Sequence, residues 1–247
     1  MRRVLGALLL VAASAAGASA QPNARSSDLT VFAAASLTNA FPKIDGSARF
    51  SFAGSNTLAA QIKLGAPADV FASANMALPA SLYRSKYCSK PVVFARNRIV
   101  LIVPRSNPAH IHTVYDLRKR GLKVVIAAPG VPVGNYTIHV LKALKLTGVL
   151  SRVVSRETDV REVLAKVALK EADAGFVYST DARTVPGKVR VLSVPSQAQP
   201  RIRYGICVVT SSSREPAAQA FVNHVLGRSG QRILLSYGFL PRVVQKR

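Results

Sequence analysis

Short apolar runs alternate with helical patterns along most of this 247-residue chain. A continuous apolar run of strand length is typical of a buried strand, and a regular alternation of such runs with helices is typical of an α/β fold. The expected strands are residues 29–34, 49–52, 69–72, 99–103, 123–127, 174–178 and 203–210. The expected helices are residues 57–64, 114–120, 135–146, 159–171, 215–227 and 231–236, together with one that starts at Ser36.

Four of the expected helix starts offer hydrogen-bond donors directly after a loop. They lie at Ser36, at Ser55, in residues 131–134 and in residues 158–160. Free N–H groups at a helix start, reinforced by the helix dipole, can bind an anion. Taken singly, each serine is better explained as a plain N-cap, which stabilises its helix by about 1 kcal/mol. Several such starts converging on one cleft would form an oxyanion pocket built from neutral donors.

The first twenty residues have the pattern of a secretory signal peptide. Arg2 and Arg3 precede an apolar run over residues 4–13, which is too short to span a bilayer. The small residues Ala18 and Ala20 predict cleavage after Ala20. We therefore expect an exported, soluble periplasmic protein. An uncleaved N-terminal membrane anchor is the alternative.

The strongly basic composition favours anionic partners. The chain has 34 Lys and Arg against 11 Asp and Glu, a formal net charge of +23. Basic clusters at Arg96 and Arg98 and at residues 118–123 fit either nucleic-acid binding or steering of a small anion toward a cleft. An export signal, the absence of Trp and the lack of aromatic residues among the basic ones argue against nucleic acid.

Motifs for metal binding, nucleophilic catalysis and nucleotide binding are missing from the sequence. His110 and His112 are close together but have no Cys or carboxylate at ligand spacing. Neither a Gly-x-Ser-x-Gly elbow nor a phosphate-binding glycine loop follows an expected strand. A hydrolase that uses Ser36 or Ser55 would need a triad assembled through space.

Two cysteines, Cys88 and Cys207, are the only ones in the chain. An oxidising compartment permits a disulfide between them, but Cys207 lies in an apolar run where a buried free thiol is equally ordinary. The sequence leaves both states open, because bridging depends on the Cα separation.

The loops described above resemble those of the periplasmic molybdate-binding proteins of ABC importers. The resemblance covers nearly all of the chain after residue 20, in the right order. It rests on LTVFAAASLTNA (29–40), SFAGSNTLAAQI (51–62), GAPADVF (65–71), VPVGNY (131–136), ETDVR (157–161), AGFVYSTDA (174–182) and YGF (237–239).

This resemblance implies a type II periplasmic binding protein, in which two α/β lobes are joined by two crossing strands and close on the ligand. We expect crossings near residues 98–103 and 204–209. The first lobe would comprise residues 21–97 and 208–247, and the second lobe residues 98–207. The implied oxyanion contacts are Ser36 and Ser55 on the first lobe, and Val133, Val160 and Tyr178 on the second.

Two departures from the family pattern lie beside these loops. Val133 stands where the family often has the smaller Ala. The segment between Ser36 and Arg49 is short, and Pro42 must kink or end the helix expected there.

The function implied is capture of molybdate, and of tungstate, for delivery to an ABC permease. Such a protein is a monomer without enzymatic activity, cofactor or nucleic-acid partner, and it holds molybdenum only as the bound oxyanion. The alternatives are a binding protein for another oxyanion such as sulfate or phosphate, an exported basic protein that binds nucleic acid or an anionic surface, and the serine hydrolase.

Overall fold

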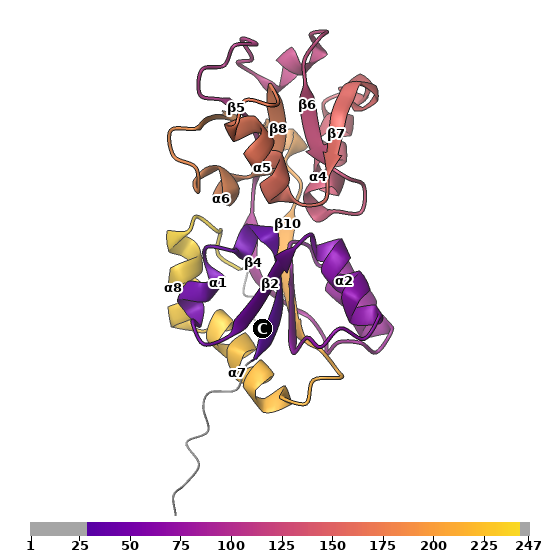
Figure 1. Ribbon diagram of the computed structural model, residues 1–247, viewed down its shortest axis with the longest axis vertical. Coiled ribbons are helices and arrows are strands. Elements are labelled where there is room, and N and C mark those ends of the chain that lie inside the picture. The colour runs from indigo at the N-terminus through magenta and orange to yellow at the C-terminus, as the bar shows by residue number, and fades with distance from the viewer. Residues whose placement is uncertain (1–28, 243–247) are drawn as a thin grey trace, which may run out of the picture.

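Residues 29–242 are described by the computed structural model and form two lobes (Figure 1), each built on a five-stranded mixed sheet. The expected signal peptide and its cleavage site lie outside these residues. The first sheet has the order β2 (Arg49–Ala53), β1 (Thr30–Ala34), β3 (Val70–Ser73), β10 (Ile202–Val208) and β4 (Val92–Asn97). The second has the order β7 (Val153–Glu157), β6 (Val124–Ala127), β8 (Ala174–Tyr178), β5 (Ile99–Pro104) and β9 (Val189–Ser193).

Helices cover both sheets (Figure 1). Those of the first lobe are η1 (Ala35–Leu37), α1 (Phe41–Ile44), α2 (Ser55–Lys63), α3 (Ala77–Arg84), α7 (Glu215–Leu226) and α8 (Arg228–Ser236). Those of the second are η2 (Val114–Arg118), α4 (Pro132–Ala143), η3 (Thr147–Arg152), α5 (Val160–Ala168) and α6 (Ser179–Ala182), with η4 (Ser196–Ala198) before the chain enters β10. Among residues 29–242, no helix is long and apolar enough to cross a membrane.

Strand direction places the loops of interest at one edge of each sheet. In the first lobe β1 runs parallel to β2 and β3, and in the second β6 runs parallel to β7 and β8. The strand β10 is antiparallel to both of its neighbours. Ligands of open α/β sheets bind beyond the carboxyl ends of the parallel strands. The predicted contacts lie in the segments that follow β1, β2, β6 and β7 and at the last residue of β8.

The two connections between the lobes lie side by side. The chain leaves the first sheet at Asn97, enters the second at Ile99 and returns before Ile202. Gln199 joins the connections, since its amide donates to the carbonyl of Ile99 at 2.7 Å and accepts from the Ile99 N–H at 3.2 Å. We expected the chain to return near residue 204, whereas the whole of β10 lies in the first sheet. The lobe boundary at residue 207 stays a prediction.

One cluster of buried apolar side chains extends through both lobes. In the first, the ring of Phe41 lies 5.7 Å from those of Phe94 and Phe221, measured between centroids. In the second, α5 turns the apolar positions of its expected stripe inward, and all four are buried: Val160, Val163, Leu164 and Val167. Burial of these faces is the main favourable term holding the elements together.

The expected strands and most expected helices are present within one to three residues at most ends. The segment after Ser36 is different: instead of one helix it forms the single turn η1 and then the four-residue α1, with Pro42 in its first turn. Pro is tolerated there because the first N–H groups of a helix have no intrahelical acceptor. Cys88 and Cys207 form a disulfide with a Cα separation of 5.9 Å, which decides the question that the sequence left open.

Candidate functional site

All five predicted contact residues line one small hollow between the lobes. Its walls include Ser36 and Ser55 from the first lobe and Val133, Val160 and Tyr178 from the second. The hollow has a cavity volume of about 10 Å³. A space of roughly 10–15 Å³ holds about one water molecule, so the hollow admits only a small group and excludes drug-sized molecules, whose pockets occupy roughly 300–1,000 Å³.

The two serines are buried and neither caps a helix. Ser36 Oγ lies 2.9 Å from the phenol oxygen of Tyr204 in a hydrogen bond, and Ser55 Oγ accepts the N–H of Ala74 at 3.1 Å. Neither η1 nor α2 has a side-chain cap. The N-cap interpretation is therefore wrong. The Ser55 hydroxyl already accepts a hydrogen bond, so its own proton is oriented by the protein and can be donated into the hollow.

The second lobe contributes the first turns of two helices. Val133 follows Pro132, which has no N–H and opens α4. Val160 is the first residue of α5, and the carboxylate of Asp159 caps this helix by accepting the N–H groups of Arg161 and Glu162. The Val160 amide is outside this cap. Amides at such positions have no intrahelical acceptor and carry the positive end of the helix dipole.

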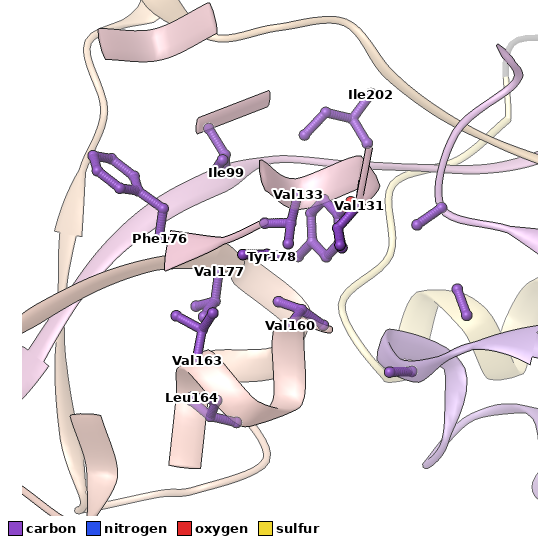
Figure 2. Close-up of a cluster of buried hydrophobic side chains, with 14 of the residues drawn as sticks. Ile99, Val131, Val133, Val160, Val163, Leu164, Phe176, Val177, Tyr178 and Ile202 are labelled. Atoms are coloured by element: carbon purple, nitrogen blue, oxygen red, sulfur yellow. The ribbon is translucent and has the colours of Figure 1, made fainter. Parts of the chain in front are cut away.

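Tyr178 supplies a third kind of donor. Its ring lies among Val131, Val133 and Val160 (Figure 2), and its phenol oxygen is buried without a hydrogen-bond partner among residues 29–242. Burial raises the pKa of Tyr178 well above its usual value of 10, so the phenol keeps its proton at neutral pH. A buried donor without an acceptor costs free energy, and an anion in the hollow would accept this hydrogen bond.

The hollow contains one charged side chain, that of Asp159, and no cationic one. Burial raises the pKa of Asp159, while the hydrogen bonds that its carboxylate accepts from the amides of Glu162 and Arg161 lower this pKa. An anion here would be held by amide and hydroxyl dipoles alone, an arrangement that can replace a hydration shell.

The roles of two residues beside the site, Tyr204 and Gly54, were not predicted from the sequence. Tyr204 lies in β10 and links Ser36 to Asn97, whose amide donates to the Tyr204 oxygen at 3.3 Å. Gly54 allows the lobes to approach, because a Cβ added there would lie 2.4 Å from the Thr158 carbonyl oxygen. In the sequence, the presence of Gly54 in the SFAGSN segment was the one feature that could have indicated its close approach to Thr158.

The histidines noted in the sequence are not part of the hollow. Within residues 29–242, no three His, Cys, Asp or Glu side chains gather as metal ligands.

A hollow between two joined α/β lobes, lined by neutral donors from both, defines a two-lobed solute-binding protein. The chain belongs to the bacterial extracellular solute-binding protein family, whose model matches residues 29–240.

Relatives in this family are similar over most of their length. The chain is 38% identical over 236 residues to a molybdate-binding protein of Mycobacterium tuberculosis, with 92% of this chain and 89% of the relative covered. A putative molybdenum ABC transporter's substrate-binding domain from Clostridium difficile is 30% identical, with a TM-score of 0.62, and 87% of this chain and 99% of that one are covered. The periplasmic molybdate-binding protein of Azotobacter vinelandii shares the fold, with a TM-score of 0.76 at 23% identity, covering 87% of this chain and all of that one.

Proposed function

We propose that this protein captures molybdate in the hollow between its lobes and delivers it to an ABC permease. The observation that carries the proposal is the convergence of five neutral donor positions, two from one lobe and three from the other, on a space for one small ion. The choice of ligand is supported by the relative named above as a molybdate-binding protein and by the substrate-binding domain of a putative molybdenum transporter.

The donors suit a tetrahedral dianion. Ser36 and Ser55 would donate hydroxyl and amide hydrogens, Val133 and Val160 their amides, and Tyr178 its phenol proton. Because the donors come from both lobes, closure completes the shell and opening dismantles it, as in other hinged binding proteins. An ion held by dipoles without a cationic partner is also easier to hand over.

The remaining features of the proposal follow from a binding role. Tungstate has the same shape and charge and would bind through the same residues, so molybdenum enters only as the bound oxyanion. No bond is made or broken, and no cofactor is required. The protein would be exported with its signal peptide cleaved after Ala20, and would work as a monomer in the periplasm without nucleic acid.

Calorimetric titration with molybdate, tungstate, sulfate and phosphate at matched ionic strength tests this function. We expect binding of molybdate and tungstate that excess sulfate does not reverse. Ser36→Ala, Ser55→Ala and Tyr178→Phe should each weaken binding by about tenfold, the value of one hydrogen bond to a charged group.

A serine away from the hollow provides the control. Ser85 is exposed at the end of α3, and Ser85→Ala should bind as the unmodified protein does. Binding of sulfate or phosphate in place of molybdate would contradict the proposed ligand. Failure of all four ions to bind would contradict the proposed function.

A further inference from the structure

Four arginines stand on one face of the connection between the lobes. In the register of β4 and β10, Arg96 lies directly opposite Arg203. Arg98 comes directly after β4 and Arg201 directly before β10, one residue beyond the paired Asn97 and Ile202. All four arginines line one cavity, so they lie on the same side of the connection. These four residues are termed the arginine face.

The arginine face lines a cavity of about 770 Å³, together with Asn97, Gln199 and Leu240. Arg201 and Arg203 also border a neighbouring space beside Pro132 and Tyr136. No residue of the 770 Å³ cavity lines the oxyanion hollow. Asn97 and Tyr204 are buried and hydrogen-bonded to each other, and Tyr204 is bonded to Ser36, so this pair lies between the cavity and the hollow.

The charges of the arginine face are not balanced within the described chain. None of its guanidinium groups forms an ion pair with a carboxylate of residues 29–242. The remaining sequence contains one acidic side chain, Asp28. Arg96 Nε donates to the carbonyl of Pro241 at 2.7 Å, a neutral partner. Like charges directly opposite each other on antiparallel strands are destabilising, and an anion bound between them would relieve this repulsion.

We propose that the arginine face binds a compact anion that carries two or more phosphate groups. The planar fork of a guanidinium group matches phosphate in a bidentate manner, and two facing pairs of forks present more charge than a single small ion can satisfy. The cavity falls in the size range of ligand pockets, roughly 300–1,000 Å³. A free polyphosphate and a cluster of lipid phosphate headgroups share this chemistry.

Titration with inorganic tripolyphosphate tests the site. Saturating molybdate keeps the oxyanion hollow occupied, and a repeat in the Ser36→Ala, Ser55→Ala double variant makes the result independent of the function proposed above. We expect saturable binding that is unchanged in this double variant. R98Q/R201Q should weaken it by at least about tenfold, since two bidentate partners are lost.

Two further variants separate a built site from diffuse attraction. R84Q/R120Q removes the same charge from exposed positions elsewhere and should change the affinity by less than about twofold. R98K/R201K keeps the charge but loses the fork, and its affinity should fall between the other two. Equal weakening in R98Q/R201Q and R84Q/R120Q would overturn the proposal. Thermal melts verify folding, and without phosphate R98Q/R201Q should melt no lower than the unmodified protein, because repulsion is relieved.

Sedimentation with phosphatidylglycerol vesicles distinguishes the source of the phosphate. Vesicle binding that R98Q/R201Q abolishes and R84Q/R120Q retains assigns the site to lipid headgroups. Tripolyphosphate binding without vesicle binding assigns it to a soluble anion. Binding of neither overturns the proposal.

Discussion

The guanidinium group of Arg161, in the second lobe, donates a hydrogen bond of 2.6 Å to Oδ1 of Asn39 in the first. The same group donates to Thr184 Oγ1 at 3.1 Å and lies 3.2 Å from a carboxylate oxygen of Asp181. Arg161 directly follows Val160, whose amide belongs to the proposed oxyanion shell. The contact with Asn39 therefore joins the lobes beside the ligand, while the other two hold the guanidinium in its own lobe.

Asn39→Ala should speed ligand release with little effect on folding. The substitution removes the acceptor on the first lobe and leaves Arg161 paired with Asp181. A hydrogen bond to a charged group contributes about 1.5–3 kcal/mol, and the exposure of Asn39 reduces this to about 1 kcal/mol, or roughly a fivefold faster dissociation. Stopped-flow displacement of molybdate by tungstate measures the rate. Thr184→Ala breaks a contact within one lobe and should change the rate less, and equal rates in all three proteins would contradict this role.

Gly54→Ala should block closure. The added methyl group would lie 2.4 Å from the Thr158 carbonyl oxygen, which belongs to the other lobe's backbone and cannot move aside alone. We expect an affinity loss of at least tenfold, about 1.4 kcal/mol, and an almost unchanged melting midpoint without ligand. Gly148→Ala is the matched control, since a Cβ there meets nothing within 4 Å. Unimpaired binding by Gly54→Ala would show that the lobes need not approach this closely.

The stability of the protein should fall as pH rises toward neutrality. Burial raises the pKa of Asp181 from 3.8 to about 7, although Arg161 opposes the shift. Between these values the folded state keeps a proton that the unfolded chain has released, so the unfolding free energy decreases with pH and levels off above about 7. Urea unfolding across this range measures the slope. Asp181→Asn should make the slope shallower, and an unchanged slope would rule out Asp181 as its source.

Removal of the disulfide should weaken the fold and spare the site. Cys88 and Cys207 are 119 residues apart in sequence, and their bond restricts the unfolded chain. The double substitution to Ala should lower the unfolding free energy by about 2–5 kcal/mol. Neither cysteine lines the hollow, so molybdate affinity in calorimetry should stay within about twofold where the variant is folded. Both cysteines share a buried cluster with Leu58 of α2, so a large loss of affinity would instead connect the disulfide to the position of that helix.

The sequence predicted those elements whose pattern is strong and local. The all-buried β5 and the stripe of α5 were clear because their apolar periodicity is uninterrupted. The strands β4, β7 and β9 were missed because each mixes polar and charged residues with apolar ones, as half-exposed strands do. The helix α3 was missed because Pro79 lies within it.

The site was predictable at the level of loops and not of contacts. Helix starts after β1, β2 and β6 indicated donors at Ser36, at Ser55 and in residues 131–134, and the family resemblance implied that they surround one ligand. The bond between Ser36 and Tyr204, which are 168 residues apart, depends on how β10 enters the first sheet. The same long-range pairing opposes Arg96 to Arg203, a juxtaposition that neither strand reveals alone.

The neutral donors of the hollow have a consequence for proton balance. The serine hydroxyls and backbone amides do not ionise near neutral pH, and burial raises the pKa of Tyr178 away from it. Asp159 is the one lining side chain that can take up a proton, because burial already raises its pKa and a bound dianion would raise it further. In Asp159→Asn the two negative charges of the dianion would remain on the complex, which should migrate less strongly toward the cathode than the free protein. The heat of binding to this variant should likewise be the same in buffers of different ionisation enthalpy.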